Sequence, residues 1–222
     1  MVPKKLVRRS VCSLVMSGAL ACLGALAAEA EVVNGSFEDP ALAAAGQFSA
    51  SGIPGWTAAG GSLGVWRLPD PSYFQADAPD GNQIGYSNGA AIAQQLPDLL
   101  APGLRIASVL AGRRDEQYAG SFRFEMWAGG TVANGVVSGG TLLDSAEFDH
   151  TLYTAATFHP LVLSYEAAID DLLLGEPLAL RLVPTGGTQM NFDRVTLPEP
   201  SGSAAMVLPA LLLGALARRR RA

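Results

Sequence analysis

Pairs of turn-forming residues that contain glycine divide the middle of this 222-residue chain into short segments. Such pairs favour tight turns, because glycine and asparagine tolerate the positive φ angles that these turns require. No segment of the interior shows a long helical period with capping residues. The pairs are Asn34-Gly35, Gly60-Gly61, Asp80-Gly81, Asn88-Gly89, Gly129-Gly130, Asn134-Gly135, Gly139-Gly140 and Gly186-Gly187.

Short runs within this part of the chain have the length and the alternation of β-strands. In Phe122–Met126 the apolar residues occupy every second position, and Leu178–Leu182 repeats the pattern. Each segment can thus present one face to a core and the other to water. Many short strands in one domain predict an all-β protein, a β-sandwich. The predicted strands are Val32–Phe37, Ser62–Leu68, Asn82–Tyr86, Ala90–Leu96, Leu104–Ala111, Ser121–Ala128, Val136–Leu143, Phe158–Tyr165, Pro177–Val183 and Met190–Leu197.

The first 30 residues have the layout of a secretory signal peptide. A basic head precedes an apolar run from about residue 11 to 27, and small-residue cleavage options end at Ala27 and Ala30. A permanent membrane anchor and a lipoprotein signal at Cys22 are the alternatives. Because Cys12 and Cys22 are the only cysteines, removal of this segment leaves a domain that no disulfide or cysteine metal site stabilises. The basic residues of the head are Lys4, Lys5, Arg8 and Arg9.

The last 25 residues combine three features in order. Pro198-Glu199-Pro200 forces an extended and exposed peptide, because proline fixes its own φ and restricts the residue before it. The apolar run that follows, from about residue 202 to 217, is slightly shorter than the roughly 20 residues of a free-standing transmembrane helix. A basic cluster then keeps the end of the chain on the cytoplasmic side. It consists of Arg218, Arg219, Arg220 and Arg221.

This arrangement resembles the PEP-CTERM sorting signal of exopolysaccharide-producing Gram-negative bacteria. The resemblance implies that exosortase, a membrane-embedded protease, recognises and processes Pro198, Glu199 and Pro200; an ordinary tail anchor is the alternative. We therefore expect a signal peptide at residues 1–30, a β-sandwich domain at 31–197 and a sorting signal with a transmembrane helix at 198–222.

These segments imply a route for the protein. We expect export by the Sec machinery, cleavage by signal peptidase and a transient inner-membrane intermediate held by the C-terminal helix. The final location is then the cell surface or the extracellular matrix.

Charge is distributed unevenly along the chain. Between Glu31 and Pro200 there are seven arginines, no lysine and 19 acidic residues, a formal net charge of −12 compared with −5 for the whole chain. A domain this acidic, without a basic stripe, argues against nucleic acid or anionic lipid as its partner. It suits an extracytoplasmic protein and leaves carboxylates available for cations.

The order of several landmarks resembles the galactose-binding-like jelly rolls, which include carbohydrate-binding modules. The resemblance implies a jelly-roll β-sandwich over nearly the whole mature domain. Those families usually end with two adjacent acids, whereas Arg194 follows Asp193 here. The landmarks are Asn34–Glu38, Gly55-Trp56, Gly81–Tyr86, Gln94–Leu96 and Gln189–Leu197.

The same resemblance implies a structural calcium site. The first and last strands of such jelly rolls lie side by side, which brings Glu38 near Asp193. Two carboxylates helped by backbone carbonyls suit Ca²⁺ rather than zinc. The alternative is that backbone amides, or an ion pair with Arg194, satisfy Glu38.

The few aromatic residues suggest a ligand site. Trp66, Tyr73 and Phe74 border a loop rich in proline and aspartate, near Asp70 and Asp77. Aromatic side chains on a loop can stack on a sugar ring while carboxylates accept its hydroxyl hydrogen bonds. Packing in the core is the alternative interpretation.

The segment Arg113-Arg114-Asp115-Glu116 follows an apolar strand. Paired arginines can bind an anionic glycan, but the adjacent acids favour an exposed turn with ion pairs.

Motifs for catalysis are missing from the sequence. His150 and His159 form no H-E-x-x-H motif, no serine lies in a G-x-S-x-G elbow, and no glycine-rich loop precedes a helix. We therefore expect a protein that is not an enzyme and associates with polysaccharide at the cell surface or in the matrix. A purely structural envelope protein and a hydrolase that uses two carboxylates are the alternatives.

Overall fold

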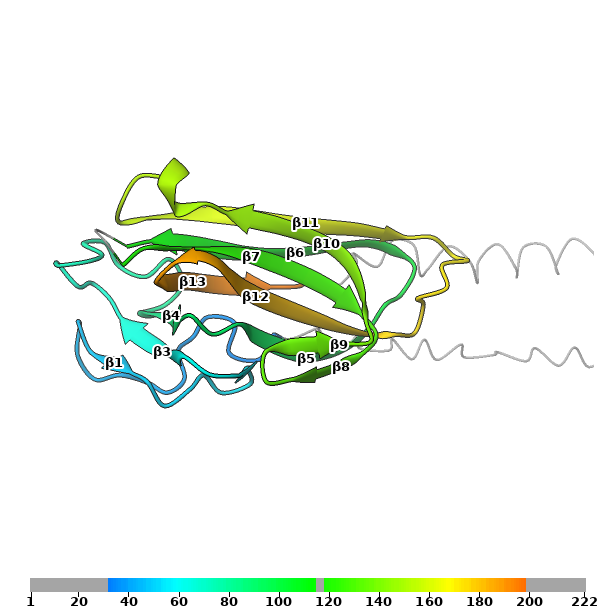
Figure 1. Ribbon diagram of the computed structural model, residues 1–222, viewed down its shortest axis with the longest axis horizontal. Coiled ribbons are helices and arrows are strands. Elements are labelled where there is room, and N and C mark those ends of the chain that lie inside the picture. The colour runs from blue at the N-terminus through cyan, green and yellow to red at the C-terminus, as the bar shows by residue number, and fades with distance from the viewer. Residues whose placement is uncertain (1–31, 115–117, 199–222) are drawn as a thin grey trace, which may run out of the picture.

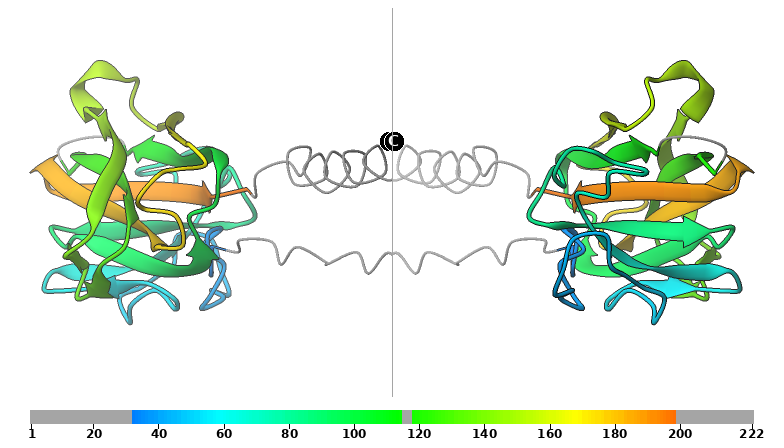
Figure 2. Two further views of the ribbon diagram at one scale, coloured as in Figure 1. Left: turned by 90° about the vertical axis from the view of Figure 1, so that its right-hand side faces the viewer. Right: turned by 90° about the vertical axis from the view of Figure 1, so that its left-hand side faces the viewer.

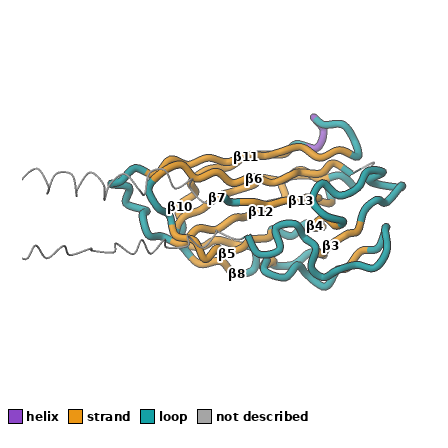
Figure 3. The backbone as a smooth tube through the Cα atoms, turned by 180° about the vertical axis from the view of Figure 1, so that it is seen from behind, coloured by secondary structure: helices purple, strands orange, loops and turns teal. Residues whose placement is uncertain are grey.

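The computed structural model describes residues 32–114 and 118–198, and these residues form an all-β protein (Figure 1). The one helical element in this part of the chain is a single 3₁₀ turn, η1 (His150–Leu152), drawn in purple in Figure 3. The strands are β1 (Phe48–Ser49), β2 (Thr57–Ala58), β3 (Ser62–Arg67), β4 (Gln83–Asn88), β5 (Ile92–Leu99), β6 (Gly103–Arg113), β7 (Gly120–Ala128), β8 (Thr131–Ala133), β9 (Val136–Ser138), β10 (Thr141–Phe148), β11 (Thr157–Ala167), β12 (Pro177–Gly187) and β13 (Gln189–Thr196).

Two antiparallel sheets face each other and make a sandwich, which Figure 2 shows along its length. The six-stranded sheet has the order β1-β3-β4-β13-β6-β11, and the five-stranded sheet has the order β10-β7-β12-β5-β2. From β4 to β7, and again from β10 to β13, the chain changes sheet at every connection. Such crossing between two sheets is the connectivity of a jelly roll. The prediction of an all-β sandwich is therefore confirmed.

Strand alternation produces the core between the sheets. On β7, Phe122, Phe124 and Met126 are fully buried, and Leu180 and Phe192 contribute to the same cluster from β12 and β13. Burial of large apolar side chains from both sheets provides the main stabilising free energy of a domain of this kind.

The strands predicted from the sequence recur with shifted ends, with two exceptions. The predicted strand Val136–Leu143 is divided at Gly139-Gly140 into β9 and β10, and β9 pairs with β8 as a small separate hairpin. The prediction of a strand at Val32–Phe37 is wrong, because these residues form turns with Asn34 and Phe37 at positive φ.

The segment at the start of the domain nevertheless lies beside the last strand. The backbone N–H of Val195 donates a hydrogen bond to the carbonyl of Gly35 at 2.9 Å. A turn thus occupies the place where we expected a strand, and it still brings Glu38 close to the end of β13.

Both predicted processing segments fall largely outside the described residues. The signal helix at 1–30 and the sorting residues Glu199, Pro200 and Arg218 to Arg221 are not described, and Pro198 is the last residue that is. Within residues 32–114 and 118–198, no helix has the length and hydropathy to span a membrane. The predicted boundaries and both terminal helices stay predictions.

Candidate functional site

A pocket of about 300 Å³ opens on the outer face of the six-stranded sheet, and we call it the sheet-face pocket. Along the strands of this sheet, apolar side chains on one face pack into the core. Those at the alternate positions form a second, smaller cluster on the opposite, outer face. The pocket lies on this second cluster. It is lined by Gly46, Phe48, Ser62, Trp66, Asp70, Tyr73, Tyr86, Asn88, Arg114 and Gln189.

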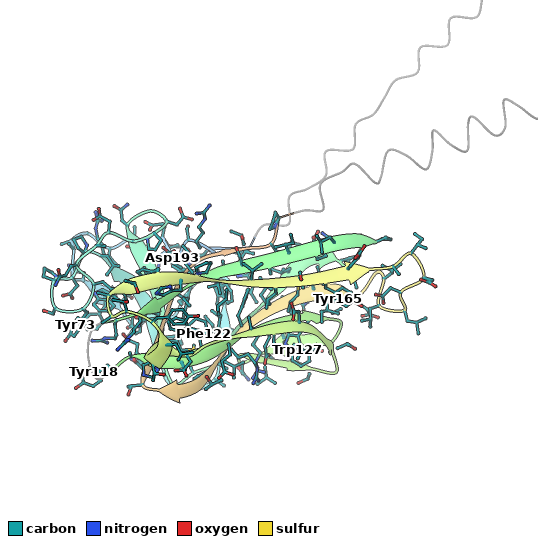
Figure 4. All side chains as sticks on the ribbon, turned by 90° about the horizontal axis from the view of Figure 1, so that it is seen from above. Tyr73, Tyr118, Phe122, Trp127, Tyr165 and Asp193 are labelled. Carbon is teal, nitrogen blue, oxygen red and sulfur yellow. The ribbon has the colours of Figure 1, made fainter. Side chains whose placement is uncertain are left out.

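Strand register places the floor of the sheet-face pocket. Asn88 on β4 pairs with Ser62 on β3 and with Gln189 on β13. The period of two along each strand then puts Tyr86 and Trp66 on the same outer face as Asn88. Loops supply the walls, and Figure 4 shows Tyr73 and Tyr118 together at one end of the sandwich, far from Trp127.

The predicted ligand residues divide into two roles. Trp66 packs edge-on against Tyr73 and Phe74, with ring centroids 5.4 and 5.9 Å apart. Trp66 and Tyr73 line the pocket, whereas Phe74 is buried below it and stacks on Phe158 at 5.0 Å. Trp66 itself is only 5% exposed. The structure thus brings the three together as a packed aromatic cluster, and ligand binding by them stays a prediction.

Close packing below the pocket depends on a glycine. A Cβ atom added to Gly112 on β6 would lie 2.6 Å from Cε1 of Phe158. Gly112 therefore leaves the space that Phe158 fills, and Phe158 in turn supports Phe74 and the aromatic wall.

Arg114 contradicts the exposed turn that we predicted for residues 113–116. It is 7% exposed, and its guanidinium carbon lies 4.0, 5.4 and 5.3 Å from the ring centroids of Tyr73, Trp66 and Tyr118. These distances are those of cation–π contacts. Burial lowers the pKa of the Arg114 guanidinium, but an arginine remains a cation at neutral pH.

A short chain of hydrogen bonds fixes the Arg114 guanidinium. Its Nη1 donates to Oε1 of Gln189 at 2.6 Å, and Nε2 of Gln189 donates to Oδ1 of Asn88 at 2.9 Å. Both amides thereby turn their acceptor oxygens toward the protein. Donor groups of Arg114 and Asn88 remain for the pocket.

Asp70 is the one carboxyl group among the described residues that line the sheet-face pocket. The backbone N–H of Ser72 donates to its Oδ1 at 3.0 Å. The hydroxyl of Tyr86 donates to the carbonyl of Ser49 at 3.2 Å, and burial raises the pKa of this phenol, so that it stays protonated. The pocket thus contains a carboxyl group able to transfer a proton, beside aromatic faces that stabilise positive charge.

The predicted calcium residues meet at a different place, beside the Asp80–Gln83 loop. Oε1 of Glu38 accepts hydrogen bonds from the backbone N–H groups of Asn82 and Gln83, both at 2.7 Å. Oδ2 of Asp193 accepts one from the N–H of Asp80 at 2.9 Å. Gly81, at φ +80°, lets the loop turn tightly over Glu38, because an added Cβ would lie 2.5 Å from Oε1.

The carboxyl group of Asp193 is buried without a cationic partner among the described residues. Asp193 is fully buried, and burial raises the pKa of its carboxyl to about 8, with the charges of Asp80 and Glu38 acting in the same direction. Within the described part of the chain no ion pair reaches either predicted ligand, and no three His, Cys, Asp or Glu side chains gather at metal distance. A calcium ion here would therefore need backbone carbonyls as further ligands. Calcium at Glu38 and Asp193 stays a proposal, and the backbone amides at Glu38 match the alternative interpretation.

Sequence reasoning missed Asn88 and Gln189 as pocket residues, and it placed ligand binding by Arg114 second to an exposed turn with ion pairs. Asn88 appeared only as part of a turn signal, and Gln189 only as part of a landmark. Side chains alternate along β6, which ends at Arg113. If this alternation is continued for one more residue, Arg114 falls on the same face of the sheet as Gly112.

Comparison with known proteins identifies relatives of the whole domain. The structure resembles the Stig cyclase Fisc from Fischerella sp. TAU in complex with (3Z)-3-(1-methyl-2-pyrrolidinylidene)-3H-indole, with 24% identity over 78% of this chain and 98% of that one and a TM-score of 0.62. A cyclase from Fischerella sp. TAU in complex with 4-(1H-indol-3-yl)butan-2-one matches at 23% identity, with the same coverage and TM-score. An apo cyclase from Fischerella sp. matches at 21% identity over 78% and 97% of the two chains, with a TM-score of 0.63. No curated protein matches the chain.

The family comparison corrects the functional prediction. The HpiC1-like model, described as HpiC1 cyclase, matches residues 28–198, which is more than three quarters of the chain. The expectation that the protein is not an enzyme is therefore wrong. It relied on the lack of familiar catalytic motifs, and a pocket assembled from separate strands and loops has no such motif. The chain belongs to the HpiC1-like family of cyclases.

Proposed function

We propose that the protein is a cyclase whose active site is the sheet-face pocket, and that its substrate is a small molecule with an aromatic ring. Family membership and the aromatic walls at Trp66 and Tyr73 support this proposal. The indole compounds bound by the two Fischerella proteins indicate the size and the chemical class of a suitable ligand. A volume of about 300 Å³ lies at the small end of the range for ligand pockets.

The observation that carries the proposal is the position of Asp70 beside these aromatic faces. In the proposed reaction Asp70 donates a proton to a carbon–carbon double bond of the substrate and so produces a cation. The ring of the substrate attacks this cation to form the new bond, and its proton then returns to the Asp70 carboxylate. The reaction is an isomerisation, without oxidant or leaving group, and the faces of Trp66 and Tyr73 stabilise the positive charge.

Binding is tested by calorimetric titration of the protein with 4-(1H-indol-3-yl)butan-2-one. Replacing Tyr73 by alanine should weaken binding by about tenfold, since an aromatic contact contributes roughly 1 kcal/mol. Trp127→Ala is the matched control, because Trp127 lies on the outer face of the other sheet and donates its Nε1 hydrogen to Glu125 at 2.9 Å. No binding by the unchanged protein, or equal losses in both variants, would refute the proposed pocket.

Catalysis is tested with indoles that carry an unsaturated side chain. An isomer changes its chromatographic retention but not its mass, so liquid chromatography with mass detection identifies the product. Asp70→Asn should abolish the product and leave the melting temperature within a few degrees. Full activity of Asp70→Asn would exclude Asp70 as the acid.

We also propose that the chain is exported and sorted by exosortase. The basic and apolar N-terminal segment and the order of Pro198-Glu199-Pro200, apolar run and arginine cluster support this route. Fractionation of cells and intact-mass measurement of the native protein test it. Recovery of the unprocessed chain from the cytosol would contradict the route.

Association with extracellular polysaccharide stays a prediction as well. Aromatic side chains beside Asp70 also suit a sugar ring, and a glycan array probed with the protein distinguishes this ligand from a small aromatic molecule.

A further inference from the structure

The hydrogen-bonding groups of the sheet-face pocket are mainly donors. Gln189 and Asn88 each direct an amide oxygen toward a protein donor, so that the Nδ2 of Asn88 has no partner within the described residues. Nε1 of Trp66 is buried, and no group in residues 32–114 and 118–198 forms a hydrogen bond with it. Asp70 carries the only carboxyl group among the described lining residues.

The guanidinium of Arg114 keeps one edge unused. A guanidinium offers five N–H donors in a flat fork. Nη1 binds Gln189, whereas Nε is buried without a partner, and no hydrogen bond to Nη2 is formed within residues 32–114 and 118–198. Because Nε is buried, Nη2 is the donor that remains for an oxygen of a ligand in the pocket.

No described carboxylate neutralises this cation directly. No carboxylate of the described residues lies within 4.0 Å of its guanidinium. Leaving a buried cationic donor without a partner is unfavourable. An anionic ligand would satisfy this donor in a place from which most water is excluded.

Resting on the proposed function, we propose that the substrate of the sheet-face pocket carries a carboxylate besides its aromatic ring. The carboxylate binds Nη2 of Arg114, with the amide of Asn88 beside it, while the ring contacts Trp66 and Tyr73. The substrate class is thus an aromatic acid, in contrast to the neutral indole ketone bound by one Fischerella cyclase.

Two matched probes test this inference. Indole-3-propionate and indole-3-propionamide share ring and chain length, but only the first is charged at neutral pH. Calorimetric titration should show that the protein binds the acid at least about tenfold more tightly than the amide, which corresponds to roughly 1.4 kcal/mol for a charge-assisted pair. Equal affinities would overturn the carboxylate inference and leave the pocket as proposed. Binding of neither probe would overturn the proposed function together with it.

Variants connect the preference to Arg114. Arg114→Gln should remove the preference for the acid, and Arg114→Lys should retain part of it, because lysine keeps the charge without the fork. Gln189→Glu keeps Arg114 and the volume of the side chain but places a carboxylate on Nη1, so it should weaken binding of the acid and not of the amide. This variant decides the question if the Arg114 variants do not fold.

Arg123→Gln is the control for distant charge, because Arg123 lies on the five-stranded sheet and pairs with Glu125 at 2.7 Å. It should leave the ratio of the two affinities unchanged. A similar loss of preference in Arg123→Gln and Arg114→Gln would attribute the effect to overall charge and contradict the proposed contact.

Discussion

Calcium added to the metal-free protein should raise its melting temperature through Asp193 and Glu38. Both carboxylates contact the same loop, and Asp193 is fully buried. A cation that binds only the folded state stabilises it by RT ln(1 + [L]/Kd), or about 2.7 kcal/mol at one hundred times its Kd. For a domain of this size each kcal/mol corresponds to about 2–4 °C, so we expect a rise of roughly 5–10 °C.

The pH dependence of the metal-free protein follows from the same residue. The pKa of Asp193 is raised to about 8 in the folded state, so the folded protein binds one more proton than the unfolded chain between about pH 4 and 8. The stabilising contribution of Asp193 is therefore fully present below about pH 4 and is lost as the pH rises toward 8. Four pH units at about 1.4 kcal/mol each give an upper bound of about 5 kcal/mol. Calcium, which stabilises the carboxylate, should remove most of this loss.

Differential scanning calorimetry between pH 4 and 8, in EDTA or in calcium, measures both effects. Asp193→Asn is the matched variant, because an amide of nearly equal volume removes the charge. It should melt at nearly constant temperature across this pH range and respond little to calcium. A calcium effect of equal size in Asp193→Asn, or no effect in the unchanged protein, would refute the site. Magnesium should have a smaller effect, since it requires a stricter octahedral geometry.

Three further changes test the packing around the two sheets. Arg181→Met should destabilise the fold by about 1–3 kcal/mol in urea denaturation, because it removes one partner, 3.3 Å away, of the buried carboxylate of Glu125, which keeps Arg123 and Trp127; adding Glu125→Leu to this variant should recover part of the loss, and no recovery would contradict the explanation. Gly112→Ala should cost about 1–3 kcal/mol and weaken ligand binding, because its Cβ would displace Phe158; a melting temperature equal to that of the unchanged protein would show that the ring has room to move. Asp171 accepts hydrogen bonds from the hydroxyl of Tyr165 and the backbone N–H of Leu173, and these lower its pKa. Its stabilising effect is therefore present above about pH 4 and is lost as the pH falls through the folded-state pKa. Asp171→Asn should flatten the acid side of the curve of stability against pH, and an unchanged curve would exclude this contribution.

Local alternation explains why the sandwich could be predicted from the sequence. Segments such as Phe122–Met126 fix which side chains face the core, independently of what pairs beside them. The turn at the start of the domain could not be predicted in this way. Val32–Phe37 has apolar residues in a strand-like order, but its conformation depends on a contact with Val195, which lies more than 150 residues away.

The sheet-face pocket was partly predictable for a related reason. Aromatic residues beside a polar loop pointed to Trp66 and Tyr73, because aromatic faces next to carboxylates suit a ligand site. The buried position of Arg114 escaped prediction, since its neighbours in sequence are acids whereas its neighbours in space are aromatic rings. Local sequence predicted an exposed ion pair, and the tertiary structure instead placed the guanidinium under Tyr73.

The acidic composition of the domain and the cation in its pocket act at different distances. A net charge of −12 between Glu31 and Pro200 produces a field that repels anions, but salt screens this field beyond about 10 Å. Inside the pocket, where the guanidinium of Arg114 is 7% exposed, the effective dielectric constant is lower and one close charge outweighs many distant ones. Composition thus excludes large anionic partners such as nucleic acid, whose charges must approach the whole surface. It says nothing against a single carboxylate small enough to reach Arg114, and that is why an acidic protein can select an acidic substrate.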